Sequence, residues 1–180
     1  MRPDLFLIKE CLQTWRIKNV LDIGAWKWYA ALFCASYWTS VDALEPQKME
    51  QFTFPNLLLD HPKIAIFRQE LNNFKINKKY DLIMLLNVIM FMDREEFLVR
   101  NMPDLFGSLS EWWYMIITFF RDDDELMNSN MSKYTISDFE TPGFTIVKSF
   151  DKAIQENHPP VGLHNHHIQF LLLQKHKPPQ

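Results

Sequence analysis

VLDIGAWKW, residues 20–28, is the stretch that decides the fold. Residues 20–23 form a short apolar run that includes one acid, and Gly24 follows directly. This is the pattern of a buried parallel strand that stops at a turn. Because residues 28–37 then read as a helix, the stretch predicts the first strand–turn–helix unit of an α/β sheet.

Strands and helices alternate outward from this unit over most of the chain. Strands are expected at residues 39–44, 63–67, 80–87 and 112–120, and helices from Asp4 to about Arg16, after Pro46, from Asp93 with a kink at Pro103, and at 137–139. The segments 144–150 and 168–173 pair best as an antiparallel hairpin, because too little chain lies between them for a parallel crossover. The sequence therefore predicts a doubly wound α/β fold in a single domain, residues 1–180, with a mostly parallel seven-stranded sheet and an antiparallel C-terminal hairpin.

Composition and charge narrow the classes of partner. The chain has 180 residues, 47% of them hydrophobic and 23% charged, and a formal net charge of −3. This charge gives no global positive field, so neither nucleic acid nor an anionic membrane is indicated as a partner. No apolar stretch approaches the roughly 20 residues of a membrane span, and the N-terminal residues do not form a signal peptide. Cys11 and Cys34 lie in apolar periodic stretches, which predicts buried, reduced thiols and a cytoplasmic location.

Ligands of doubly wound sheets bind outside the carboxyl ends of the strands. The residues to examine are therefore those that follow Ile23, Leu44, Phe67 and Leu86. Glu45 ends the second strand about 20 residues after the first turn, where an acid can accept both ribose hydroxyls of a nucleoside. The sequence thus predicts a nucleoside site that includes Glu45.

Several segments together resemble the class I S-adenosylmethionine-dependent methyltransferases. Residues 20–28 are similar to that family's first motif, V-L-D-I-G-C-G-x-G, and Glu45 stands where its second strand ends in an acid. Residues 67–71 (FRQEL) resemble its adenine-contacting segment, residues 80–83 (YDLI) its fourth strand, and residues 87–91 (NVIMF) the segment near the methyl donor and acceptor.

The resemblance covers residues 17–175 and implies S-adenosylmethionine as the cofactor, with methyl transfer to a small-molecule acceptor. Residues 88–91 and 161–164 are in addition similar to tellurite-type and other small-molecule methyltransferases. The cofactor-binding residues that the resemblance implies are Asp22, Gly24, Ala25, Trp26, Glu45, Glu70, Leu71 and Asn87. No catalytic residue is named, because methyl transfer needs mainly the approach and alignment of the two reacting centres.

Two tryptophans depart from the family pattern. Trp26 and Trp28 occupy positions where the family has glycines that let the backbone approach the cofactor. Trp26 therefore either flanks the ligand as a wall or fills its space. The alternative function is a methyltransferase-fold protein without catalysis, which acts as a binding or scaffold subunit for a protein partner. A nicotinamide-dependent oxidoreductase is disfavoured, because the sequence lacks G-x-G-x-x-G and has no chain for a substrate domain.

The predicted site residues also have ordinary structural explanations. Asp22 can accept hydrogen bonds from the amides of its own turn. Glu45 and Glu70 can be solvated acids after strands, and Asn87 can satisfy a neighbouring backbone group. The sequence leaves these alternatives open.

Four histidines, His158, His164, His166 and His167, lie close together near the C-terminus. No cysteine is near them and their spacing matches no known zinc site, so we expect an exposed hairpin edge and no metal. The acidic residues 122–125 are expected in a solvated loop.

Overall fold

The computed structural model describes residues 2–14, 16–26, 28–46, 61–158 and 162–176. The seven strands in these ranges form one sheet in the order β3-β2-β1-β4-β5-β7-β6. The strands are β1 (Asn19–Ile23), β2 (Ser40–Leu44), β3 (Ile64–Phe67), β4 (Tyr80–Leu86), β5 (Leu109–Phe120), β6 (Phe144–His158) and β7 (Gly162–Lys175). The helical segments are α1 (Pro3–Thr14), α2 (Tyr29–Ser36), α4 (Arg94–Glu96), α5 (Met102–Ser108), the 3-10 turns η2 (Leu71–Asn73), η3 (Ile89–Phe91) and η5 (Ile136–Phe139), and the π-helical segment η4 (Phe97–Asn101).

β1 lies in the middle of the parallel part of the sheet. It pairs in parallel with β2 and with β4, so that Val20 is in register with Val41 on one side and Leu82 on the other. β5 continues the parallel set, and β7 and β6 add an antiparallel hairpin at the edge. The predicted fold, including the central place of residues 20–23, is confirmed.

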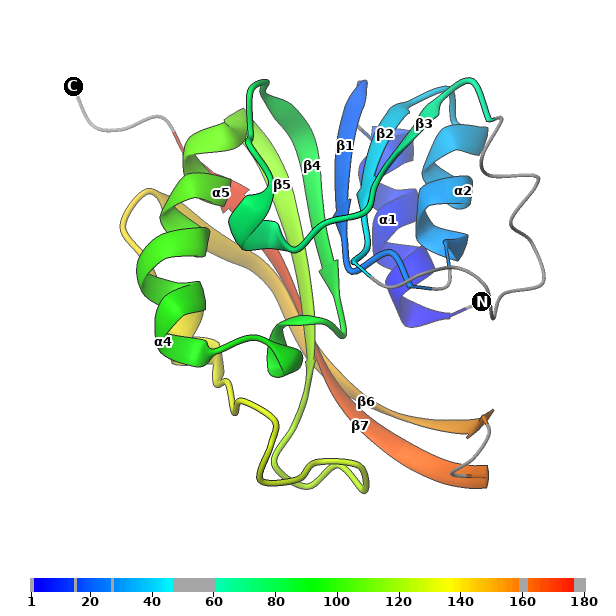
Figure 1. The fold of residues 1–180 in the computed structure, drawn as a ribbon, viewed down its shortest axis with the longest axis vertical. Helices are drawn as coiled ribbons and strands as arrows, with labels where there is room; N and C mark the ends of the chain where they lie inside the picture. Colours follow the sequence, from blue (N-terminus) through cyan, green and yellow to red (C-terminus); the bar gives the residue numbers. More distant parts are fainter. Residues whose placement is uncertain (1, 15, 27, 47–60, 159–161, 177–180) are drawn as a thin grey trace.

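Helices cover both faces of the sheet (Figure 1). α1 and α2 lie on one face, and α4, η4 and α5 lie on the other. β1, β2 and β4 are largely buried, because the helices on both faces cover their side chains. Cys11 and Cys34 are buried free thiols, as predicted. No helix within the described ranges is long and apolar enough to cross a membrane.

The helix that begins after Asp93 is interrupted by the π-helical segment. Asp93 caps the helix, because its Oδ1 accepts a hydrogen bond of 2.8 Å from the backbone N–H of Glu96. In η4 the N–H of Met102 bonds to the carbonyl oxygen of Phe97. Pro103 follows immediately and has no N–H to donate, so the widened turn accommodates the proline without ending the helix. The kink expected at Pro103 therefore takes the form of a π-helical segment.

β5 begins earlier than predicted, at Leu109 instead of residue 112. Tyr80 is in register with Leu109 and Leu82 with Tyr114, so β5 carries extra, bulged residues opposite the start of β4. Trp112 lies in this bulge with a φ of +69°. Such irregularity interrupts the alternation of buried and exposed side chains, which explains why the sequence pattern marked only the later part of the strand.

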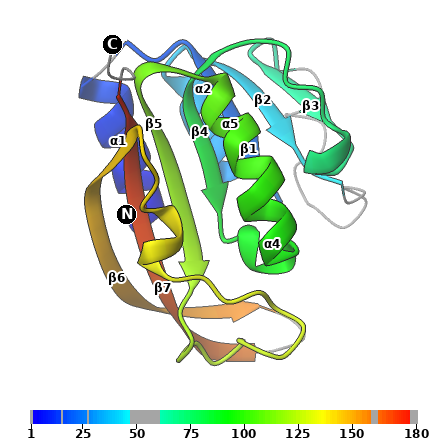
Figure 2. The same cartoon turned by 90° about the vertical axis from the view of Figure 1, so that its left-hand side faces the viewer.

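The hairpin is much longer than the predicted segments 144–150 and 168–173. It extends past the carboxyl ends of β4 and β5 and curves below them, as Figures 1 and 2 show. This extension brings hairpin residues to the edge of the sheet where ligands of this architecture bind. The helix expected after Pro46 falls on residues 47–60, outside the described residues.

Candidate functional site

A cavity of about 440 Å³ lies at the carboxyl ends of β1, β2 and β4. Six of the predicted cofactor-binding residues line it: Asp22, Gly24, Ala25, Trp26, Glu45 and Asn87. Its size falls within the roughly 300 to 1,000 Å³ typical of ligand pockets. The structure thus brings together residues from three strand ends that are far apart in the sequence.

The turn after β1 is held by backbone hydrogen bonds. The N–H groups of Gly24 and Ala25 both donate to the carbonyl oxygen of Leu44, at 2.8 and 3.2 Å. The N–H of Trp26 donates to the Gly24 carbonyl at 2.7 Å, and that of Trp28 donates to the Ala25 carbonyl at 2.8 Å. These four N–H groups therefore already donate hydrogen bonds within the protein.

Gly24 allows this turn to pack closely against the segment after β4. Its φ is +73°, in the left-handed region, and a Cβ at this position would lie 2.4 Å from Cγ2 of Val88. Because Val88 also lines the cavity, a side chain at Gly24 would move part of the cavity wall.

The two tryptophans of the turn take different places. Trp26 lines the cavity and is 43% exposed. This position is compatible with both alternatives for the residue, a wall beside the ligand and a side chain that fills part of its space. Trp28 is buried and caps α2 with a φ of +56°. A left-handed backbone costs a bulky residue of the order of 1 kcal/mol, whereas removing a buried tryptophan ring costs about 3 to 5 kcal/mol. Burial of the indole therefore outweighs the backbone strain.

Asp22 is buried, and its carboxyl group lies near a second acid. Burial raises the pKa of Asp22 to about 7, and the negative charge of Glu45 acts in the same direction. A backbone hydrogen bond from Ala31, in the first turn of α2, partly opposes this rise in pKa. Oδ2 of Asp22 has no hydrogen-bond partner within the described residues. A buried acceptor of this kind favours a ligand that brings a hydrogen-bond donor or a positive charge.

Glu45 and Asn87 follow directly on β2 and β4. Glu45 is buried, and its N–H donates to the carbonyl oxygen of Phe67 at 3.0 Å, which fixes its backbone beside β3. Asn87 has a φ of +52°, a conformation that asparagine tolerates better than most residues. Its Oδ1 accepts a hydrogen bond of 2.8 Å from the hydroxyl of Thr118. The Asn87 side chain therefore accepts a hydrogen bond from the neighbouring strand β5 and also lines the cavity.

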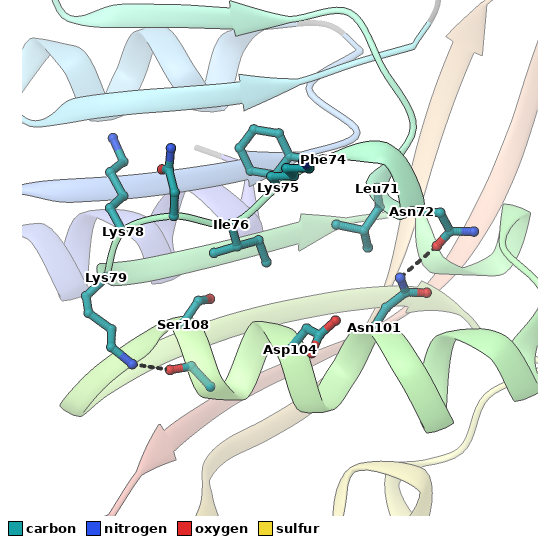
Figure 3. A pocket seen from close by; sticks show the side chains of 12 residues that line it. Leu71, Asn72, Phe74, Lys75, Ile76, Lys78, Lys79, Asn101, Asp104 and Ser108 are labelled. Carbon is teal, nitrogen blue, oxygen red and sulfur yellow. Dashed lines mark hydrogen bonds between the residues drawn. The ribbon is translucent and has the colours of Figure 1, made fainter.

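Glu70 and Leu71 lie away from this cavity. Glu70 is exposed and directly precedes η2. Leu71 lines a second hollow of about 800 Å³, which lies between residues 71–79 and α5 (Figure 3). The structure does not bring these two residues to the other six.

Polar groups in the second hollow hold the loop to the helix. Nδ2 of Asn101 donates to Oδ1 of Asn72 at 2.7 Å, and Nζ of Lys79 donates to the carbonyl oxygen of Gly107 (Figure 3). The hollow adjoins the amino end of β4, whereas ligands of parallel sheets bind at the carboxyl ends. The cavity at the carboxyl ends is therefore the candidate site.

Arg2, directly before α1, and residues of α2, of the segments at and after the ends of β4 and β5, and of the hairpin also line this cavity. Those outside the predicted set include Arg2, Tyr29, Phe91, Phe120, Leu126, Met131, Glu156 and His166. Arg2 joins two of these parts, because its Nη1 lies 3.2 Å from Oε1 of Glu156 on β6. Residues 88–91 were singled out by the resemblance, but no local pattern marked Arg2 or Glu156.

The prediction of an exposed histidine edge is wrong for His164 and His166, which are 5% and 4% exposed. Their Nε2 atoms are 2.8 Å apart, and Nδ1 of His166 lies 3.2 Å from Oδ2 of Asp124. The ring of His166 also stacks on Phe120, with 4.6 Å between ring centroids. The long hairpin packs against the residues after β5, which buries two rings that a shorter hairpin would expose.

The prediction of a solvated acidic loop is wrong for Asp124, which is buried. Its Oδ1 accepts a hydrogen bond from the N–H of Leu126 at 2.9 Å, and its Oδ2 accepts one from the N–H of His167 at 2.8 Å. Oε2 of Glu125 accepts a hydrogen bond of 2.7 Å from the N–H of Asn165. These bonds attach the loop to β7. No group of three or more His, Cys, Asp or Glu side chains in the described ranges is arranged to hold a metal ion.

The chain is similar in fold to solved structures that include two named methyltransferases. The chain is similar to TehB from Haemophilus influenzae, with a TM-score of 0.76 and 15% identity over 98% of this chain and 63% of that chain. It is similar to the N-methyltransferase NodS from Bradyrhizobium japonicum WM9 in complex with S-adenosyl-L-homocysteine, with a TM-score of 0.70 and 12% identity over 97% of this chain and 85% of that chain. It is also similar to 1,6-didemethyltoxoflavin-N1-methyltransferase from Burkholderia thailandensis, with a TM-score of 0.70 and 15% identity over 98% of this chain and 78% of that chain.

These similarities are similarities of fold. No family model and no curated protein matches the sequence. The chain spans less than two thirds of the length of TehB, and all three identities are low. The strand order, the antiparallel hairpin and these neighbours agree that the chain has the fold of the class I S-adenosylmethionine-dependent methyltransferases.

Proposed function

We propose that this protein binds S-adenosylmethionine in the cavity at the carboxyl ends of β1, β2 and β4 and transfers its methyl group to a small-molecule acceptor. The observation that carries the proposal is a pair of unpartnered polar atoms. Within the described residues, Oδ2 of Asp22 and Nε1 of Trp28 are buried without a hydrogen-bond partner, and both side chains line the cavity. An unpaired buried polar group costs roughly 1 to 3 kcal/mol, so a polar ligand that pairs these atoms is favoured.

The charges of the cavity suit this cofactor. In the described part of the chain, three acids, Asp22, Glu45 and Glu156, line it together with one arginine, Arg2. S-adenosylmethionine has a positive ammonium, a positive sulfonium and one carboxylate, and when bound it supplies a methyl group on positively charged sulfur. The acids favour its positive groups, and Glu45 follows the strand whose end accepts ribose hydroxyls in sheets of this kind.

Apolar side chains line the cavity beside these charged groups. They come from η3 and from the segment that begins at the end of β5: Phe91, Phe120, Leu126 and Met131. Such walls exclude water and hold a small molecule through burial of its surface. Because methyl transfer depends mainly on alignment, the side chains that position the acceptor contribute more than an acid–base pair does.

The neighbouring structures support the same proposal. NodS was solved with S-adenosyl-L-homocysteine, and the Burkholderia enzyme with S-adenosylhomocysteine and 1,6-didemethyltoxoflavin. Both share the fold of this chain, and each is a methyltransferase by name. We infer the same cofactor and a small acceptor for this chain, in a cytoplasmic protein of one domain.

A second candidate is a binding or scaffold subunit without catalysis. Trp26 and Trp28 stand where the resembling motif has glycines, and both line the cavity. A wall of this size beside the turn reduces the room for the methionine part of the cofactor. If the protein is a scaffold subunit of this kind, the wild type is expected not to bind the cofactor.

Calorimetric titration with S-adenosylmethionine and S-adenosylhomocysteine separates the two candidates. We expect the wild type to bind both ligands and Glu45→Ala to bind each about 10- to 100-fold more weakly, because charge-assisted hydrogen bonds are worth about 1.5 to 3 kcal/mol. Glu70→Ala is the matched control, since Glu70 is an exposed acid outside the cavity. If the folded wild type binds neither ligand, the methyltransferase proposal is wrong and the scaffold subunit is favoured. If Glu45→Ala binds the ligands as tightly as the wild type does, Glu45 is not part of the binding site.

A further inference from the structure

The carboxylate of the proposed cofactor finds no free amide among the described N–H groups of the turn after β1. The N–H groups of residues 24–26 and of Trp28 all donate to backbone carbonyls. At the start of α2, the backbone of Ala31 is hydrogen-bonded to Asp22. One N–H group at the helix N-terminus, where anions commonly bind, is thus already engaged by a carboxyl group of the protein itself.

Arg2 is the one arginine or lysine that lines the cavity within the described residues. Its Nη1 lies 3.2 Å from Oε1 of Glu156, and its Nε lies 3.4 Å from Oδ1 of Asp4. Its guanidinium carbon lies 4.6 Å from the centre of the Tyr29 ring. These contacts come from α1, α2 and β6, and neither ion pair uses Nη2, which carries two N–H donors.

We propose that Arg2 binds the carboxylate of S-adenosylmethionine, an inference that rests on the proposed function. A guanidinium presents a planar fork of donors that matches the two oxygens of a carboxylate. Asp4, Tyr29 and Glu156 hold this fork at the cavity before a ligand arrives, which reduces the entropy lost on binding. Glu156 also competes with the ligand for the guanidinium.

The test compares two ligands that differ only in the carboxylate. Wild type and Arg2→Ala are titrated calorimetrically with S-adenosylmethionine and with decarboxylated S-adenosylmethionine. We expect Arg2→Ala to weaken binding of S-adenosylmethionine about 10- to 100-fold and to leave binding of the decarboxylated ligand unchanged or tighter. Arg2→Lys keeps the charge without the planar fork, so we expect an intermediate loss, and it supplies the same comparison if Arg2→Ala does not fold.

Three further variants separate ligand binding from structural effects. Glu156→Gln removes the competing carboxylate and is expected to bind S-adenosylmethionine at least as tightly as the wild type. Arg121→Ala is the matched control, because Arg121 pairs with Asp123 and Asp151 outside the cavity. Lys27→Ala tests the other cation near the turn in the sequence.

The outcomes are distinguishable. Equal weakening of both ligands by Arg2→Ala assigns Arg2 a structural role and overturns the inference, as does a carboxylate-specific loss in Lys27→Ala alone. A wild type that binds decarboxylated S-adenosylmethionine as tightly as S-adenosylmethionine also overturns it while leaving the proposed function in place. A wild type that binds neither ligand overturns the proposed function and this inference with it.

Discussion

Asp22 is subject to two opposing requirements. Its place in the sheet requires burial, whereas the charge of its carboxyl group favours contact with water or with a positive ligand. Asp22 belongs to β1, a largely buried strand, and it lines the cavity near Glu45. Burial and the neighbouring acid both disfavour its charged form, which raises its pKa to about 7. Without a positive ligand, the protein is therefore destabilised when this carboxyl group ionises.

This cost predicts a pH dependence of stability. The pKa of Asp22 is raised from 3.8 to about 7 in the folded state, so the folded state binds the proton more tightly and its stability falls as pH rises from about 4 to 7. We expect Asp22→Asn, compared with the wild type, to gain about 2 to 3 kcal/mol between pH 5 and pH 8, because only the wild type carries the buried charge at the higher pH. Urea unfolding of both proteins at the two pH values measures this difference, and a constant difference would show that Asp22 titrates normally.

Residues of the site differ in how far the sequence could identify them. Gly24 and Glu45 could be predicted because each directly follows a strand, and the carboxyl ends of parallel strands meet at one edge of the sheet. Arg2 and Glu156 could not, since their place depends on where the start of α1 and the far part of the hairpin come to lie. The backbone conformation of Trp28 could not be predicted from the sequence either, because its left-handed backbone is maintained by burial of the indole in the tertiary structure.

At the scale of elements, the hairpin and the loop after β5 stabilise each other. Asp124 accepts hydrogen bonds from the N–H groups of Leu126 in the loop and His167 on β7, and its carboxylate also pairs with His166. His166, the partner of Asp124, lines the cavity together with Phe120, on which its ring stacks. The buried carboxylate therefore connects the shape of the cavity to the position of the hairpin.

We expect Asp124→Ala to destabilise the protein by about 2 to 4 kcal/mol, because it leaves buried donors without an acceptor. Asp123→Ala is the matched control: Asp123 is an exposed neighbour that pairs with Arg121 and His167, and we expect little change. Chemical denaturation of the two variants measures both effects. Similar small losses in the two variants would mean that the loop is not fixed by Asp124.

The length of the hairpin shows why element boundaries were harder to predict than elements. Residues 144–150 and 168–173 could be predicted because both read as strands with too little chain between them for a parallel crossover. In the structure, the second of them pairs with the buried part of β5. Residues 151–157 are largely exposed and polar, so the strand continues without an apolar pattern. Backbone pairing with β7 maintains this extension, and pairing between segments is not visible in either segment alone.

At the scale of the whole molecule, the cavity gathers parts of the chain from both ends. Arg2 lies directly before α1, and Glu156 and His166 lie on the hairpin, while the strand ends supply Asp22 and Glu45. The order of strands alone predicts that the strand ends meet, which is why the fold and the edge that carries the site followed from the alternation of strands and helices. Contacts of one ligand with all these parts would stabilise them together.

We therefore expect S-adenosylhomocysteine to slow hydrogen exchange at segments that are distant in sequence. A ligand that binds only the folded state adds about 2.7 kcal/mol of stability at 100 times its dissociation constant, and this protection reaches every segment whose opening breaks the site. Protection should appear at the start of α1, at residues 121–131 and in the far half of the hairpin, while residues 71–79, which line the separate hollow, serve as the internal control. Exchange measured by mass spectrometry with and without the ligand gives the comparison. Protection centred on residues 71–79 would place the ligand in the hollow of Figure 3, and the cavity at the strand ends would no longer be the site.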